Sequence, residues 1–227
     1  KEGVENSNYK LIMSTETYIL TIFEKRVDKK ELPFFIRLQK FLVEKNFKCP
    51  KPVSNKKGNY INQIKNKVCV INTFLKGKKA DPITKYHCQQ LGKLLSIMHI
   101  KTYDFKLFRE NTLSQKQWRN IFEKFRYNQN TEYKKLFEEI NIEINFLEKN
   151  WPKNLPSGII HADAFQDNIF FINNVFSGMF DFYFACNDYY SYELAICINA
   201  WCFNAQHELD TNKSAALLHS YQNHKKL

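Results

Sequence analysis

The sequence predicts an α+β fold in which a small antiparallel β-rich lobe precedes a larger, mainly helical lobe. Short runs rich in β-branched and aromatic residues dominate up to about residue 75, and helical periodicity dominates from Asp81. Short apolar runs then flank a polar loop between residues 158 and 181. We therefore expect two lobes, residues 1–75 and 76–227, joined near Phe74.

The first lobe is predicted to contain two hairpins and one helix. The elements are a hairpin of residues 9–14 and 18–23, a helix capped by Asp28 and ending near residue 46, and a second hairpin of residues 60–64 and 68–71. Leu32, Phe35, Leu38 and Leu42 place one apolar stripe on the helix.

The second lobe is predicted to be helical around a few short strands. Asp81 is a candidate N-cap, with Pro82 at the first helical position. The elements are helices to residue 99, over 114–127 and over 131–149, strands at 158–160, 169–171 and 178–180, and a final helix that carries Leu194, Ile198 and Trp201.

Composition excludes several classes of function. The net charge is +11, but the lysines are scattered and no zinc-finger spacing or RNA-binding motif appears, so we expect no nucleic-acid partner. Six cysteines without a C-x-x-C pair indicate buried thiols rather than a disulfide framework. No apolar run approaches the roughly 18 residues of a membrane span, and no signal peptide is visible, so a cytoplasmic protein is expected.

The most informative stretch has the pattern H-x-D-x-x-x-x-N, formed by His161, Asp163 and Asn168, with Asp181 after a short apolar strand. Phosphoryl transfer requires a carboxylate at the acceptor hydroxyl and metal ions at the phosphate oxygens. Asp163 is the candidate base, and Asn168 and Asp181 are candidate magnesium ligands. His161 is interpreted as a scaffold of this loop rather than a proton donor. The alternative is a loop whose Asp and Asn only cap turns.

These residues resemble the motif of the aminoglycoside phosphotransferase and choline kinase superfamily. Within it the chain resembles the bacterial homoserine kinases of threonine biosynthesis. The matching segments are residues 3–9, 18–24, 91–99, 181–188 and 193–203, so the resemblance covers essentially the whole chain. It implies a protein-kinase-like two-lobed fold and a cytoplasmic, magnesium-dependent transferase.

The resemblance implies that ATP phosphorylates the hydroxyl of L-homoserine to give O-phospho-L-homoserine. The nucleotide would contact a turn at Asn6, Ser7 and Asn8, the second strand at Thr21, and a linker in which Thr73 and Leu75 lie. Many relatives have a phosphate-binding lysine where this chain has Thr21. Lys25 or Arg26, with Glu31 as partner, are candidate substitutes.

Two residues beyond Asp181 are candidates for binding the acceptor. Asn187 and Asp188 could bind a zwitterionic substrate, or they could cap a helix that begins near Tyr189. Other acceptors remain open, namely choline, methylthioribose or an aminoglycoside, as does a non-catalytic nucleotide-binding relative. Oligomeric state is undetermined, and both ends look short for the family, so a fragment is expected.

Overall fold

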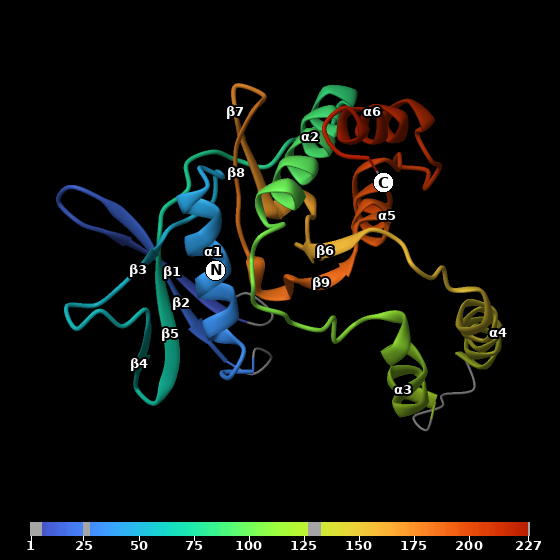
Figure 1. Ribbon diagram of the computed structural model, residues 1–227, viewed down its shortest axis with the longest axis horizontal. Coiled ribbons are helices and arrows are strands. Elements are labelled where there is room, and N and C mark those ends of the chain that lie inside the picture. The colour runs from blue at the N-terminus through green and yellow to red at the C-terminus, as the bar shows by residue number, and fades with distance from the viewer. Residues whose placement is uncertain (1–5, 25–27, 127–132, 227) are drawn as a thin grey trace.

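The computed structural model describes residues 6–24, 28–126 and 133–226, and it shows an antiparallel sheet followed by helices (Figure 1). The strands are β1 (Asn6–Ile12), β2 (Thr17–Phe23), β3 (Pro52–Val53), β4 (Ile61–Ile64), β5 (Lys67–Thr73), β6 (Ser157–Ile160), β7 (Ile169–Ile172), β8 (Val175–Met179) and β9 (Cys186–Tyr189). The helices are α1 (Leu32–Glu44), α2 (Lys85–Lys101), α3 (Gln115–Arg126), α4 (Lys134–Asn150), α5 (Tyr190–Trp201) and α6 (Thr211–Gln222).

The first sheet contains both predicted hairpins. Its order is β1-β2-β5-β3, and β4 also pairs with β5. Lys65 and Asn66 both have positive φ, the geometry of a two-residue hairpin turn, which explains the tight connection between β4 and β5. The first hairpin is longer than predicted, because β1 already begins at Asn6.

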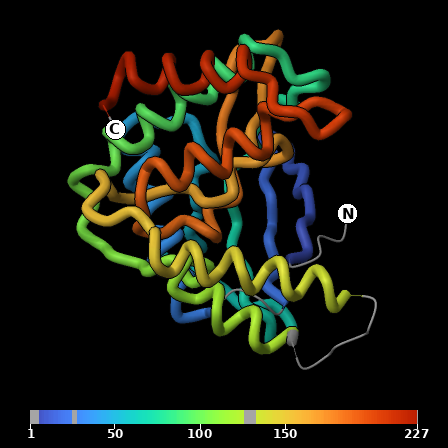
Figure 2. Tube along the Cα trace, turned by 90° about the vertical axis from the view of Figure 1, so that its right-hand side faces the viewer, coloured from blue at the N-terminus to red at the C-terminus, as the bar shows by residue number. Residues whose placement is uncertain are grey.

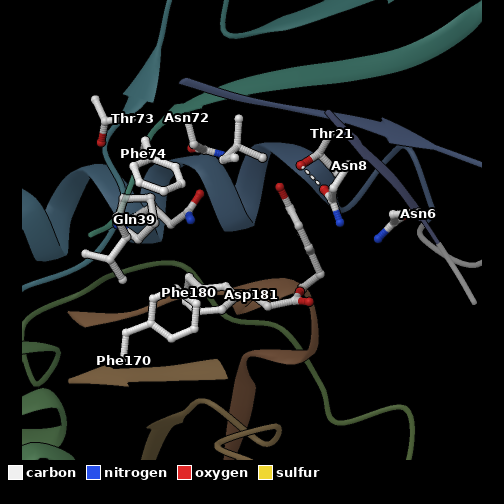
Figure 3. A pocket seen from close by; sticks show the side chains of 14 residues that line it. Asn6, Asn8, Thr21, Gln39, Asn72, Thr73, Phe74, Phe170, Phe180 and Asp181 are labelled. Atoms are coloured by element: carbon white, nitrogen blue, oxygen red, sulfur yellow. Dashed lines mark hydrogen bonds between the residues drawn. The ribbon is translucent and has the colours of Figure 1, made fainter. Parts of the chain in front are cut away.

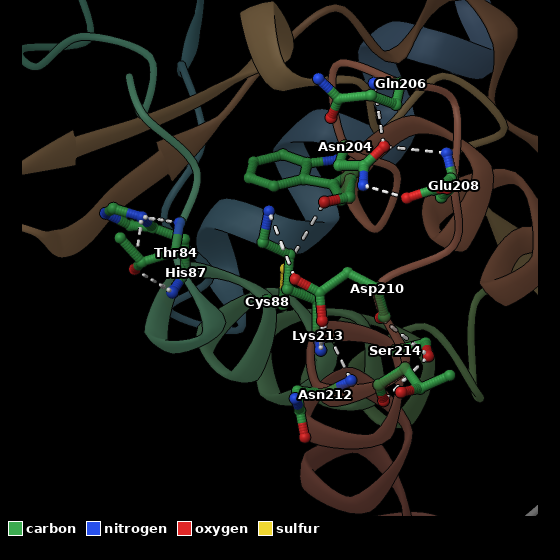
Figure 4. A network of polar contacts seen from close by, with 12 residues as sticks. Thr84, His87, Cys88, Asn204, Gln206, Glu208, Asp210, Asn212, Lys213 and Ser214 are labelled. Atoms are coloured by element: carbon green, nitrogen blue, oxygen red, sulfur yellow. Dashed lines mark hydrogen bonds and ion pairs between the residues drawn. The ribbon is translucent and has the colours of Figure 1, made fainter.

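Two predicted helix caps are wrong. The helix α1 begins at Leu32, because Pro33 suits a first turn; Asp28 instead closes the preceding turn by accepting from the Lys30 N–H at 2.9 Å. The helix α2 begins at Lys85, and its cap is Thr84, whose hydroxyl accepts from the His87 N–H. Figure 4 shows Thr84 and His87 at this cap.

The helices of the second lobe form two groups. Helices α2, α5 and α6 pack around the short strands, while α3 and α4 lie side by side away from them (Figure 2). Sequence reasoning missed both α6 and β9. Asp210 caps α6 by accepting from the Asn212 and Lys213 N–H groups, a signal that the sequence does contain.

The short strands position the functional loops. Strand β9 pairs antiparallel with β6, and β7 pairs with β8. One continuous core joins the α1 side of the first sheet to these strands through Phe35, Phe182 and Trp201. Within the described residues, no helix is long and apolar enough to cross a membrane.

Candidate active site

The first sheet presents one row of side chains to a cleft beneath it. Asn8 pairs with Thr21, Thr21 pairs with Val70, and Ile19 pairs with Asn72. Residues directly opposite each other in a sheet project from the same face, and so do residues two apart on one strand. The sheet residues that line the cleft are Asn6, Asn8, Ile19, Thr21, Asn72 and Thr73 (Figure 3).

The β7–β8 hairpin forms the facing wall of the cleft. Ile169 pairs with Met179, and the Phe180 N–H donates to the Asn168 carbonyl at 3.1 Å. Asn168 and Asp181, which flank the hairpin, therefore lie at the same end, as the sequence predicted. Phe180 and Asp181 both line the cleft.

Asn168 holds Asp163 in place. Its Nδ2 donates to the Asp163 backbone carbonyl at 2.8 Å and to the Asp163 Oδ2 at 2.9 Å. Both bonds use the amide nitrogen, so neither of them occupies the amide oxygen of Asn168. The structure thus brings Asp163, Asn168 and Asp181 together.

Burial and neighbouring negative charges raise the pKa of two carboxylates at this site. Burial raises the pKa of Asp163 to about 7; the Asp181 charge adds to the rise, the hydrogen bond from Asn168 opposes it, and the Asp167 charge adds to it. Burial also raises the pKa of Asp181, while the Tyr183 backbone N–H opposes this rise and Asp167 adds to it. A cluster of carboxylates that resist ionisation suits a cation that neutralises them.

His161 acts as a scaffold in this structure. Its ring is buried, its Nε2–H donates to the Phe180 carbonyl at 3.0 Å, and the Asp163 N–H lies 3.3 Å from Nδ1. These partners require the neutral Nε2–H tautomer. Burial lowers the pKa of His161, in agreement with a neutral ring, although the Glu193 charge opposes this. The His161 ring therefore joins its own loop, residues 161–168 and called the catalytic loop below, to the strand that precedes Asp181.

A fully buried carboxylate supports the backbone of the same loop. Glu193, at 0% exposure, accepts from the His161 N–H at 2.6 Å and from the Ala162 N–H at 2.9 Å through Oε1. Its Oε2 lies 2.6 Å from the His99 Nε2, and the His99 Nδ1 lies 2.9 Å from the Tyr221 hydroxyl. The chain of contacts links α6, α2 and α5 to the catalytic loop.

Backbone strain in the loop leads to a stability prediction. Ala162 has φ of 61°, a left-handed conformation that costs a residue with a Cβ about 1 kcal/mol. We expect Ala162→Gly to raise the free energy of unfolding by about 0.5–1 kcal/mol. Chemical denaturation measures this, with Ala164→Gly as the control, since Ala164 is buried and the same change there destabilises. A lower free energy of unfolding in Ala162→Gly than in the parent would contradict the interpretation that Ala162 is strained.

Several predicted nucleotide contacts take a different form. Asn6, Ser7 and Asn8 were expected in a turn that offers backbone N–H groups, but they lie in β1, a strand paired with β2. Asn6 and Asn8 face the cleft with their side chains. Ser7 points to the other face, and its hydroxyl donates to Glu24 at 3.1 Å. Alternation along a strand explains this split.

Thr21 does lie in the cleft, where the sequence comparison with kinases would place a lysine. Its hydroxyl donates to the Asn8 Oδ1 at 2.7 Å. The candidate substitutes Lys25 and Arg26 fall outside the described residues. Glu31, their proposed partner, forms an ion pair with Arg109 at 2.8 Å.

Several residues that line the cleft escaped sequence reasoning, namely Ile19, Gln39, Pro50, Phe170, Phe180 and Tyr183. Gln39 of α1 and Tyr183 both line the cleft. Gln39 lies four residues after Phe35 and three before Leu42, so it interrupts the apolar stripe, and that interruption is a signal that could have identified it. Tyr183 is two residues beyond Asp181 and carries no such signal.

The linker after β5 closes one end of the cleft. Thr73 and Leu75 both line it, together with Phe74. The N–H groups of Thr73 and Phe74 donate to the Lys51 and Thr17 carbonyls at 2.9 and 3.1 Å. Among the described residues, the Leu75 backbone N–H has no hydrogen-bond partner. Of the two predicted linker contacts, Leu75 is therefore the one that could donate a backbone hydrogen bond to a ligand.

Asn187 and Asp188 are on β9, not at a helix cap. Helix α5 begins at Tyr190 without a side-chain cap, so the capping interpretation is wrong. Both residues line a second cavity, between β9 and the segment that leads to α3. The Asn187 Oδ1 accepts from the Arg109 N–H at 3.0 Å, and Asp188 accepts from the Asn111 amide at 2.7 Å. Asp163 is not among the residues that line this cavity.

The donor set fits a divalent cation shared with a phosphate ligand. The described residues hold no cluster of three or more His, Cys, Asp or Glu side chains that could bind a metal alone. Asn168 and Asp181 offer one amide and one carboxylate oxygen donor side by side. Mg²⁺ prefers oxygen ligands and is commonly bound by one or two carboxylates plus substrate phosphates, so two protein ligands suffice.

The sequence is similar to known phosphotransferases over its whole length. A model of the phosphotransferase enzyme family matches residues 1–227. The homoserine kinase of Bartonella tribocorum is 43% identical over 222 residues, covering 98% of this chain and 70% of the relative. The homoserine kinase of Parvibaculum lavamentivorans is 43% identical over 220 residues, covering 97% and 68%.

Solved structures share the fold at low sequence identity. The amicoumacin kinase hAmiN in complex with AMP-PNP, Ca²⁺ and Ami superimposes with a TM-score of 0.81 at 16% identity, over 100% of this chain and 72% of that one. Choline kinase from Cryptosporidium parvum gives 0.68 at 15% identity, over 99% and 71%. These likenesses confirm the predicted kinase-like α+β fold.

Proposed function

The chain belongs to the phosphotransferase enzyme family, and from this premise we propose that it transfers the γ-phosphoryl group of ATP to the hydroxyl of L-homoserine, forming O-phospho-L-homoserine. The observation that carries the proposal is the contact of Asp163 with Asn168, near the charge of Asp181, which itself lines the cleft. The identity of about 43% to homoserine kinases supports the choice of acceptor.

Each residue of the site has a separate role in the proposed reaction. Asp163 orients the acceptor hydroxyl and takes its proton as the oxygen attacks phosphorus. Its raised pKa makes it a stronger base than a solvated aspartate. Asn168 and Asp181 would hold Mg²⁺, which neutralises charge on the transferred phosphoryl group. His161 and Glu193 position the loop from behind.

The cleft supports ATP as the phosphoryl donor. Ile19 lies on its sheet side and Phe170 and Phe180 on the other, so a flat base has apolar walls above and below. The linker offers the backbone N–H of Leu75 to the edge of the base. Asn6, Asn8 and Thr21 then line the route from the base toward Asp181.

A direct assay tests the proposal. The protein is incubated with ATP and Mg²⁺ and with homoserine, choline, methylthioribose or an aminoglycoside, and the product is identified by phosphorus NMR and mass spectrometry. We expect O-phosphohomoserine and little product from the others. Preference for another acceptor would refute the substrate, and ATP binding without any turnover would favour a non-catalytic relative.

The second cavity suggests where the zwitterion binds. Carboxylates of Asp188 and Glu110 and the ammonium of Lys116 line it, so it offers both signs of charge to an amino acid. We therefore expect Asp188→Asn to raise the KM for homoserine about tenfold, the loss of one charge-assisted hydrogen bond, and to leave the KM for ATP unchanged. Steady-state kinetics measures both; an unchanged homoserine KM would place the acceptor elsewhere.

A further inference from the structure

Arg109 lies where three parts of the molecule meet. Its side chain is 10% exposed, and its Nη2 donates to the carboxylate of Glu31, at the start of α1, at 2.8 Å. Its Nη1 donates to the carbonyls of Phe184 and Ala185, at 3.5 and 3.2 Å. The Arg109 main chain bonds Asn187 of β9, through its N–H at 3.0 Å and its carbonyl at 2.7 Å. The side chain therefore joins α1 to the segment before β9, whereas the main chain supports the second cavity.

The turn after Asp181 begins in a conformation that its surroundings must hold. Asp181 has φ of 64°, in the left-handed region, and directly precedes the 3₁₀ helix Phe182–Phe184. Residues with a Cβ seldom adopt this region, and they keep it where the surrounding structure fixes them. The Ala185 N–H closes the turn by donating to the Phe182 carbonyl at 3.0 Å. Ala185, whose carbonyl accepts from Arg109, is thus the end of the turn opposite Asp181.

An aromatic ring of α1 lies beneath the guanidinium and also meets this turn. The Arg109 guanidinium is 5.0 Å from the ring centroid of Phe35, which is fully buried. Phe35 meets Tyr183 edge to face, with ring centroids 5.6 Å apart. The stacking and the ion pair with Glu31 anchor the guanidinium to α1. Arg109 therefore fastens the turn to the helix that also lines the nucleotide cleft through Gln39.

We propose that Arg109 is a positioning residue for Asp181, an inference that rests on the proposed kinase function. It fixes the turn so that the Asp181 carboxylate meets the metal ion that a bound nucleotide brings. Residues that orient a metal ligand without touching the metal typically contribute about 10–100-fold to metal affinity or activity. A planar guanidinium can bind the Glu31 carboxylate and the two carbonyls together, whereas a single ammonium lacks this fork.

Binding of ADP with and without Mg²⁺ tests this role, because the ratio of the two affinities reports the metal contact and needs no acceptor. Isothermal titration compares the parent with Arg109→Met and Arg109→Lys, in Mg²⁺ and in chelator. Arg109→Met should bind ADP in chelator as the parent does, but should lose about tenfold of the tightening that Mg²⁺ gives. Arg109→Lys should keep the ion pair with Glu31 and recover the melting temperature without recovering the tightening. A merely structural side chain would make both recover together.

Kinetics separates the side chain from the main chain. Both variants keep the main-chain bonds to Asn187, so we expect kcat to fall about tenfold while the KM for homoserine is unchanged. Arg119→Met is the matched control. The Arg119 guanidinium donates to Glu148 and Asn141 of α4, which lies away from the short strands, so its loss should change neither the Mg²⁺ effect nor kcat.

An unchanged Mg²⁺ effect in Arg109→Met, or one that Arg109→Lys restores in full, would overturn the role of Arg109 and leave the proposed kinase function intact. If Arg109→Met does not fold, the same ratio in Arg109→Lys decides. A parent protein whose affinity for ADP does not depend on Mg²⁺ would overturn both proposals. A parent that shows the Mg²⁺ effect but does not phosphorylate homoserine would overturn the choice of acceptor alone.

Discussion

Asp163→Asn is expected to lower kcat by about 10³-fold and, in the metal-free protein, to raise the melting temperature at pH 8. The loss of activity follows from removing the group that takes the hydroxyl proton, since general-base catalysis contributes about 10²–10⁴-fold. The gain in stability follows from the pKa of Asp163, which folding raises from 3.8 to about 7. Folding therefore opposes ionisation of this carboxyl.

The sign of the pH dependence can be worked out from that pKa. Below about pH 4 the carboxyl is protonated in both the folded and unfolded states and contributes no penalty. As pH rises from about 4 to 7, only the unfolded state ionises freely, so stability falls; above pH 7 the penalty is complete. Asp163 is only part-buried, and solvent screening reduces the penalty to about 1 kcal/mol at pH 8.

Thermal unfolding in chelator at pH 4 and pH 8 measures this effect. The melting temperature of Asp163→Asn should exceed that of the parent by a few degrees at pH 8 and match it at pH 4. Asp104→Asn is the control. Asp104 forms an exposed ion pair with Lys45, which lowers the pKa of Asp104, so removing this carboxylate should stabilise the protein at neither pH. Turnover retained by Asp163→Asn would remove Asp163 as the base.

The sequence predicted the candidate catalytic and metal-binding residues better than it predicted the residues that support them. Asp163, Asn168 and Asp181 are identifiable because a fixed spacing and one hairpin bring them together. Glu193, by contrast, acts from a helix about 30 residues further along the chain. Its contact with His99, and the contact of His99 with Tyr221, depend on how α2, α5 and α6 pack. Such contacts leave no local pattern to read.

Predictions made from a few neighbouring residues alone also gave one wrong turn and two wrong helix starts. The polar run at Asn6, Ser7 and Asn8 has turn composition, yet pairing with β2 makes it a strand. Asp28 and Asp81 are good caps in isolation, but the hydrogen bonds that form at Lys30 and Thr84 decide where the helices begin. Strand pairing therefore overrode composition in β1, whereas at the two helix starts a different local hydrogen bond formed from the one expected.

Glu193→Ala is expected to have the largest effect on stability. Glu193 accepts from the N–H groups of His161 and Ala162 and pairs with His99, each at 2.9 Å or less. Its carboxylate is inaccessible to solvent. Each buried donor left unpaired costs about 1–3 kcal/mol, so we expect a loss of about 4 kcal/mol in the free energy of unfolding. Because the same N–H groups hold the loop before Asp163, kcat should fall by about 100-fold even where the variant is folded.

Glu193→Gln separates hydrogen bonding from charge. The amide oxygen can still accept from the loop N–H groups, and the amide nitrogen can donate to His99 if that ring carries its proton on Nδ1 and donates to Tyr221. We therefore expect Gln to recover most of the stability and activity that Ala loses, measured by denaturation and by kcat at 15 °C. Glu143→Ala on the exposed face of α4 should stay within about 0.5 kcal/mol of the parent. If Gln fails as badly as Ala while Glu143→Ala is neutral, then the negative charge itself, and not the hydrogen-bond network, holds the catalytic loop in place.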